Sequence, residues 1–227
     1  MADDELVERV RALRSQGRSP KDIARATGAR PAEVTRIVRE LGRDAHRAEA
    51  GTLVGVWVSR GWSAGLGVPD DHPDWDDDPD AGMEGLVSVL LARRDRPQRL
   101  SVCGYLVDTY CLGVKNALGP MVMGDRELAD FRPMFFQAME PVEAPAELAR
   151  HLVLGAVEYA RTLGFQPHPD FAAVAGHLGE LPGGSVLTFG RDGVPTYISG
   201  PDDDPARVVR TLTRTVGPDG FHAVTHA

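Results

Sequence analysis

The chain is poor in cysteine, with only Cys103 and Cys111 among its 227 residues. Small secreted domains that depend on disulfides need several pairs, so this content argues against a disulfide framework. Apolar runs long enough to span a bilayer are also missing. The first ten residues, MADDELVERV, are acidic, whereas a secretory signal begins with positive charge. We therefore expect a reduced, cytoplasmic protein that does not associate with membranes.

Length and composition are compatible with two folded parts. Hydrophobic residues make up 42% of the chain and aromatic residues 6%, as in ordinary globular proteins. A chain of this length accommodates one small module and one domain with a substantial core. We expect the small module at residues 1–45 and an α+β domain at residues 51–227. Ligand sensing, dimerisation and protein contact all remain open as roles for the larger domain.

The net charge of −8 is divided unevenly between these two parts. Residues 1–45 hold 10 Arg and Lys against 8 Asp and Glu, a balance of +2. The remaining residues hold 15 against 25, a balance of −10. Binding to nucleic acid phosphates depends on local positive charge. The N-terminal part therefore meets this requirement better than the acidic remainder does.

Residues 19–41, SPKDIARATGARPAEVTRIVREL, have the pattern of two short helices around a glycine turn. Ser19 is suited to cap the first helix, and Pro20 suits the first helical position because its missing N–H has no partner there. Gly28 supplies the bend, and Pro31 starts the second helix. Residues 5–16 form a preceding amphipathic helix in this interpretation, completing a three-helix unit.

The second helix has its apolar residues at helical spacing, and these are Val34, Ile37, Val38 and Leu41. With the glycine turn and the run Val34-Thr35-Arg36, residues 17–42 resemble the helix-turn-helix of Lac-repressor-type and resolvase-type DNA-binding proteins. For residues 51–227 we identify no family.

This resemblance implies sequence-specific contact with double-stranded DNA through residues 17–43. The expected contact residues are Arg18, Lys21, Arg30, Ala32, Thr35, Arg36 and Arg39. A single small module buries little surface, so two copies on two half-sites are expected. A homodimer formed through residues 51–227 would provide them. The helix expected at 145–163 is apolar over more than one stripe, which is compatible with either a core position or a dimer contact.

The sequence of residues 51–227 predicts a mainly antiparallel sheet with packed helices. Strands are expected at 51–60, 85–92 and 100–107, pairing as a meander around a polar loop at 61–83 and a basic turn at 93–99. Residues 185–189 and 194–198 are expected to flank a hairpin turn. Helices are expected from Asp108 to the Gly119–Pro120 stop signal, and at 125–138, 145–163, 169–181 and 204–216.

Several polar groups in residues 51–227 are candidates for chemistry. Asp108, Cys111 and Lys115 would share one helix face just after a strand, where catalytic groups are common. A helix cap with a core cysteine explains them more simply. The aspartates between residues 70 and 80 offer oxygen ligands, but their spacing does not match a calcium-binding loop.

The remaining candidates have structural explanations. Residues 190–193 and 200–204 do not match phosphate-binding fingerprints, and the aspartates at 202–204 suit helix capping. His168 lies between prolines, in a rigid loop. We therefore assign no catalytic residue, no metal ligand and no cofactor.

The function expected is that of a transcriptional regulator or DNA-associated accessory factor. The first alternative is a nucleic-acid-directed enzyme, a metal-assisted hydrolase that uses Asp108, Lys115 and the acidic loop. The second alternative is a protein-interaction module with no role on DNA, supported by the acidic surface alone.

Overall fold

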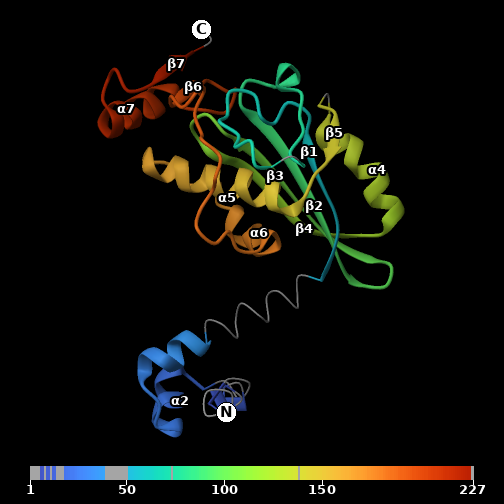
Figure 1. Ribbon diagram of the computed structural model, residues 1–227, viewed down its shortest axis with the longest axis vertical. Coiled ribbons are helices and arrows are strands. Elements are labelled where there is room, and N and C mark those ends of the chain that lie inside the picture. Colours follow the sequence, from blue (N-terminus) through green and yellow to red (C-terminus); the bar gives the residue numbers. More distant parts are fainter. Residues whose placement is uncertain are drawn as a thin grey trace. The chain divides into compact units, whose positions relative to one another are not determined.

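The structure is a computed structural model that describes residues 6–7, 9–10, 12–13, 18–38, 51–72, 74–137 and 139–225. The chain divides into two compact units, Met1–Ala50 and Gly51–Ala227. Each unit has an apolar cluster of its own. In the first unit, α2 (Pro20–Thr27) is followed by helical residues at 31–38, and the described residues between 6 and 13 are also helical (Figure 1).

The second unit is an α+β fold around a five-stranded antiparallel sheet with the strand order β4-β3-β2-β1-β5 (Figure 1). The strands are β1 (Thr52–Ser59), β2 (Leu86–Arg96), β3 (Arg99–Asp108), β4 (Gly113–Met123) and β5 (Pro141–Glu143). The predicted three-strand meander is confirmed as β1, β2 and β3. The turn between β2 and β3 is shorter than the expected segment 93–99, because β2 continues to Arg96 and β3 begins at Arg99.

Helices pack on this sheet, and a short parallel strand pair follows them in the sequence. The remaining elements are η1 (Pro79–Ala81), α4 (Asp125–Phe136), α5 (Ala146–Thr162), α6 (Phe171–Leu178), β6 (Thr196–Ile198), α7 (Pro205–Val216) and β7 (His222–Val224). The four helices predicted from residue 125 onward are therefore present. Asp204 caps α7 as expected, with its carboxylate accepting the Arg207 amide at 3.0 Å.

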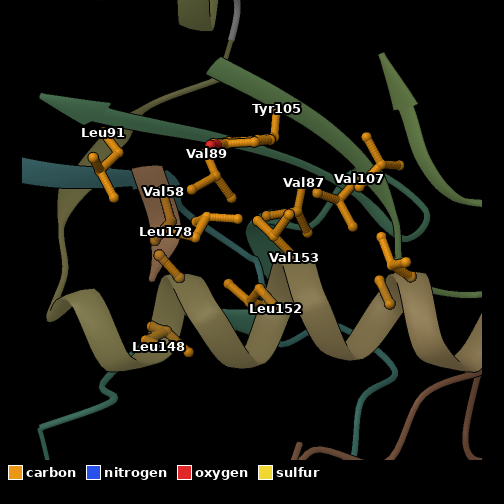
Figure 2. Packing of buried hydrophobic residues seen from close by; sticks show 14 of the residues in the cluster. Val58, Val87, Val89, Leu91, Tyr105, Val107, Leu148, Leu152, Val153 and Leu178 are labelled. Carbon is orange, nitrogen blue, oxygen red and sulfur yellow. The ribbon is translucent and has the colours of Figure 1, made fainter. Parts of the chain in front are cut away.

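One face of the sheet packs against α5 and α6 and forms the main core. Alternate strand residues such as Val87, Val89 and Tyr105 point toward this face, as the two-residue period of a strand requires. Leu152 on α5 is fully buried against them (Figure 2). Because α5 is covered along this side by its own sheet, its apolar breadth is accounted for within the domain.

The opposite face of the sheet packs against α4 over only part of its length. The residues buried there include Leu90 and Val102 from the strands and Leu128 and Phe136 from α4. On the same strands, Leu86 lies closer to the end of the sheet and is 37% exposed. This face is therefore only partly covered.

The helix predicted after Asp108 is wrong, because Gly113–Met123 is the edge strand β4. Val114 and Ala117 both face the main core, and their spacing of three residues resembles a helical period. That spacing arises from a β-bulge, since Leu106 pairs with Asn116 whereas Val107 pairs with Val114. The Gly119–Pro120 pair, interpreted as a helix stop, lies inside β4, where an edge strand tolerates proline.

The predicted hairpin around residues 190–193 is only partly correct. Arg191 and Val194 do form a bridge, but residues 185–189 form no regular strand. Leu187 and Phe189 instead bury their side chains in the main core. Their apolar character is the reason why residues 185–189 resembled a strand. The second predicted strand survives as β6, which pairs in parallel with β7.

Candidate functional site

The first candidate surface is built on the N-terminal unit, where the expected capping residues are in place. Ser19 Oγ accepts the Asp22 amide at 3.2 Å, and Pro20 occupies the first position of α2. Gly28 ends the helix with a φ of 72°, a left-handed conformation that favours glycine. These three residues fix where α2 begins and ends, as predicted.

The apolar cluster of this unit joins α2 to the helical residues that follow it. Ile23 and Ala24 of α2 pack with Val34 and Ile37, and Val10 completes the buried set. Since these residues occupy the interior, the polar positions of residues 31–38 lie on other sides of the helix.

The predicted DNA-contact residues lie on the outside of this unit, as far as they are described. The exposed ones are Arg18, Lys21, Arg30, Ala32 and Arg36. Thr35 is half-buried, and its hydroxyl donates to the Pro31 carbonyl at 2.8 Å. Arg39 lies outside the described residues, as does residue 17 and the stretch 39–43.

Their arrangement has two notable features. Ala32, Thr35 and Arg36 share one side of the second helical segment, because residues three and four apart are neighbours on a helix. Arg18 lines a shallow cavity of about 330 Å³ together with Asp22 and Arg25 of α2. Asp22 also forms an ion pair with Arg25 at 3.8 Å, which moderates the positive charge there.

The second candidate site lies at the turn between β3 and β4. Asp108 ends β3, and its Oδ1 accepts the amides of Tyr110 and Cys111, each at 2.9 Å. It therefore stabilises a strand-to-strand turn, and the expected helix cap is wrong. Burial raises the pKa of Asp108 from 3.8 to about 6, against the opposing effect of those amides and of Lys115. Cys111 is fully buried, and burial raises its thiol pKa, which disfavours a nucleophilic thiolate.

Lys115 reaches the same region from the bulge in β4. Its Nζ donates to Asp203 Oδ2 at 2.9 Å, and that oxygen also accepts the Gly200 amide at 2.8 Å. Burial works against ionisation of Asp203, but the Gly200 amide and the Lys115 ammonium outweigh it and lower the pKa of Asp203. Asp108 and Lys115 therefore lie in the same region, although they are not on a helix. Cys111 does not line the cavity that these two residues share.

These groups line a cavity of about 210 Å³. The full lining is Glu84, Leu86, Asp108, Lys115, Thr196, Ile198, Ser199, Gly200 and Pro201. Sequence reasoning singled out Asp108 and Lys115 but missed Glu84 and the segment 196–201. The only available signal was an isolated lysine in an apolar segment close to an aspartate at a strand end.

The acidic loop has a structural role in the residues that are described. Asp77 accepts the amides of Gly61 at 2.7 Å and Ser63 at 2.8 Å, and Asp78 caps η1. His72 stacks on Trp75 with ring centroids 3.9 Å apart. Within the described part of the chain, no group of three or more His, Cys, Asp or Glu side chains is placed to hold a metal ion.

Two histidines are held by backbone groups. His168 Nδ1 accepts the Asp170 amide at 3.3 Å, which fits the structural role expected for it. His151 was not singled out from the sequence, and its Nδ1 accepts the Val186 amide at 3.1 Å. Ser185 lies beside it but donates its hydroxyl proton to the His151 carbonyl at 3.1 Å. His151 Nδ1 also lies 3.3 Å from Ser185 Oγ, so this ring nitrogen is shared between the serine hydroxyl and the Val186 amide.

Comparison with protein-family models, with curated proteins and with solved structures finds no match for this chain. Its function must therefore be argued from its own residues. None of the helices in the described residues is long and apolar enough to cross a membrane.

Proposed function

We propose that the chain is a sequence-specific DNA-binding protein, either a transcriptional regulator or a DNA-associated accessory factor. In this proposal, the helical residues between 6 and 13, α2 and residues 31–38 act as a three-helix helix-turn-helix module. Residues 31–38 serve as the recognition helix in the major groove.

The observation that carries this proposal is the division of the second helical segment into two sides. Val34 and Ile37 are buried in the apolar cluster, while Ala32 and Arg36 are exposed. An arginine in this position is suited to bidentate contact with guanine, and the Ala32 and Thr35 methyl groups suit contact with thymine. Arg18 and Lys21, at the start of α2, are suited to phosphate contact.

A homodimer formed through residues 51–227 remains part of the proposal, because two modules bind two half-sites more tightly than one. The apolar breadth of α5 no longer supports it, since Leu152 and its neighbours are buried in the domain's own core. Sedimentation of the full chain at tens of micromolar tests the dimer directly. A monomer at that concentration would contradict it.

The metal-assisted hydrolase has less support in the structure. Asp108 and Lys115 do converge, but Lys115 is paired with Asp203 and Asp108 is held by two backbone amides. The acidic loop aspartates Asp77 and Asp78 bind backbone amides instead of gathering around one point.

The experiment begins with selection of a duplex from a random-sequence pool by the full chain. Fluorescence anisotropy then compares the selected duplex with a shuffled one at several salt concentrations. We expect Arg36→Ala to weaken binding to the selected duplex by roughly 1–3 kcal/mol. The difference in affinity between the selected and the shuffled duplex should become smaller. Arg18→Ala should weaken both and reduce the salt slope by about one.

The matched control is Arg161→Ala, which removes the same charge from an exposed position on α5. Its affinity should equal that of the unchanged chain. If the pool yields no enriched sequence and the chain ignores duplex DNA at low salt, the proposal is wrong. An equal loss from Arg161→Ala and Arg36→Ala would indicate binding by overall charge alone.

A further inference from the structure

The partly covered face of the sheet continues into two adjoining cavities. Ser88 pairs with Leu106 and Leu86 pairs with Asp108 across β2 and β3. These residues alternate in phase with Leu90, which faces α4, so they share that face. Leu86 and Asp108 line the 210 Å³ cavity, while Ser88 and Leu106 line a second cavity of about 420 Å³. The two cavities therefore follow one another along the strands.

The smaller cavity carries an excess of negative charge. Lys115 is the basic residue in its lining, and its ammonium is already matched by Asp203 at 2.9 Å. Among the described residues, neither Asp108 nor Glu84 takes part in an ion pair. Asp108 is only 6% exposed, and its Oδ1 accepts the amides of Tyr110 and Cys111. The nearby Lys115 ammonium favours the ionised form of Asp108 without forming an ion pair with it. A bound cation would further offset the cost of burying this carboxylate.

The larger cavity is mainly apolar. Leu106 and Leu118 come from the sheet, and Phe131, Met134 and Phe135 come from α4. Met134 is 67% exposed, although it belongs to this apolar lining. Flexible methionine and aromatic side chains suit an apolar ligand of variable shape. Successive side chains on one strand face are roughly 7 Å apart, which sets the distance from the Asp108 carboxylate to the apolar lining at Leu106.

We propose that these adjoining cavities bind a small amphipathic organic cation, with its ammonium group at Asp108 and Glu84 and its apolar body between Leu106 and α4. Two observations favour this occupant over others. The two carboxylates, which form no ion pair among the described residues, select a positive head group, and the mainly apolar lining of the larger cavity selects a ligand with a hydrophobic body. An anion would face both carboxylates, and a purely apolar ligand would supply no ion-pair partner for Asp108.

Isothermal titration calorimetry on the full chain tests this with three ligands of one shape: 4-phenylbutylamine, 4-phenylbutan-1-ol and 4-phenylbutyrate. The amine should bind with a Kd below roughly 1 mM. The alcohol should bind at least about tenfold more weakly, because it lacks the charge-assisted hydrogen bond. The carboxylate should show no binding.

Two variants assign the binding to these residues. Asp108→Asn keeps an oxygen for the turn amides but removes the charge, and Glu84→Gln removes the charge of an exposed side chain. Each should reduce amine affinity by about tenfold and bring it toward that of the alcohol. Asp130→Asn removes an exposed carboxylate from α4 and should have no effect.

Amide chemical shifts recorded during the titration locate the ligand. Shifts at Leu106, Lys115 and Leu118 are expected. The proposal is overturned if the amine does not bind, if the alcohol binds equally well, or if the shifts occur elsewhere. It is also overturned if Glu84→Gln and a folded Asp108→Asn both leave amine affinity unchanged. None of these outcomes depends on DNA binding.

Discussion

The two units of the chain differ in what they bury. The buried residues described in the N-terminal unit are all apolar: Val10, Ile23, Ala24, Val34 and Ile37. The second unit buries polar residues as well, among them Asp108, Thr109 and His151. When the interior is apolar, the polar groups that could contact a partner lie on the outer surface. When a charged side chain is buried, the interior itself contains a polar group that needs a contact. The first unit therefore presents its arginines outward, and the second presents a cavity.

The largest effect should come from placing a charge in the apolar interior of the N-terminal unit. Ile37→Asp would bury a carboxylate with no partner, and a five-residue buried cluster cannot compensate for it. We expect residues 18–38 to lose all protection from hydrogen exchange, while β2 and β3 retain theirs. Ile37→Val is the control and should keep both regions protected. Loss of protection in both regions would show that the two units share one cooperative core.

A cavity in the main core should destabilise the second unit. Leu152→Ala removes a fully buried side chain from α5 and should lower the free energy of unfolding by about 2–5 kcal/mol. Chemical denaturation followed by tryptophan fluorescence measures this unit, because Trp57, Trp62 and Trp75 all lie within it. A loss below about 1 kcal/mol would show that α5 is less tightly packed than its burial indicates.

A smaller and pH-dependent effect is expected at Asp108. Its pKa is about 6 in the folded chain and 3.8 ordinarily, so the folded state holds the proton more tightly between these values. Stability contributed by the protonated form is therefore complete below about pH 4 and is lost as the pH rises through about 6. The shift corresponds to at most roughly 3 kcal/mol.

Asp108→Asn removes this titration while keeping an acceptor for the turn amides. We expect the variant to gain stability relative to the unchanged chain as the pH rises from 4 to 7, measured by urea denaturation at each pH. Asp130→Asn, at an exposed site, should show no such trend. If the difference in free energy of unfolding between Asp108→Asn and the unchanged chain stays constant across this pH range, the pKa of Asp108 is not shifted by folding.

Local features of both units could be predicted from the sequence because they depend on neighbouring residues. Ser19, Gly28 and Asp204 each act on backbone groups within a few positions, so their capping roles were visible in the chain. The apolar runs at 85–92 and 100–107 likewise predicted the strands β2 and β3.

The sequence did not reveal features that depend on distant residues. The bulge at Lys115 reflects pairing with β3, and the bulge itself made β4 resemble a helix. The charged cavity joins Glu84 and Asp108 to residues 196–201, more than 80 positions further along the chain. No local pattern encodes that meeting, because it is produced by the packing of β6 and α7 near the β3–β4 turn.

The bulge at Lys115 also bears on how this chain can change in evolution. Lys115 is the extra residue, because Val107 pairs with Val114 and Leu106 pairs with Asn116. Deleting Lys115 would leave a regular strand in which Val114 and Ala117 still face the main core and Asn116 still faces outward. Descendants of this gene can therefore lose the bulge without reversing the faces of β4, and the contact they would give up is the ion pair of Lys115 with Asp203.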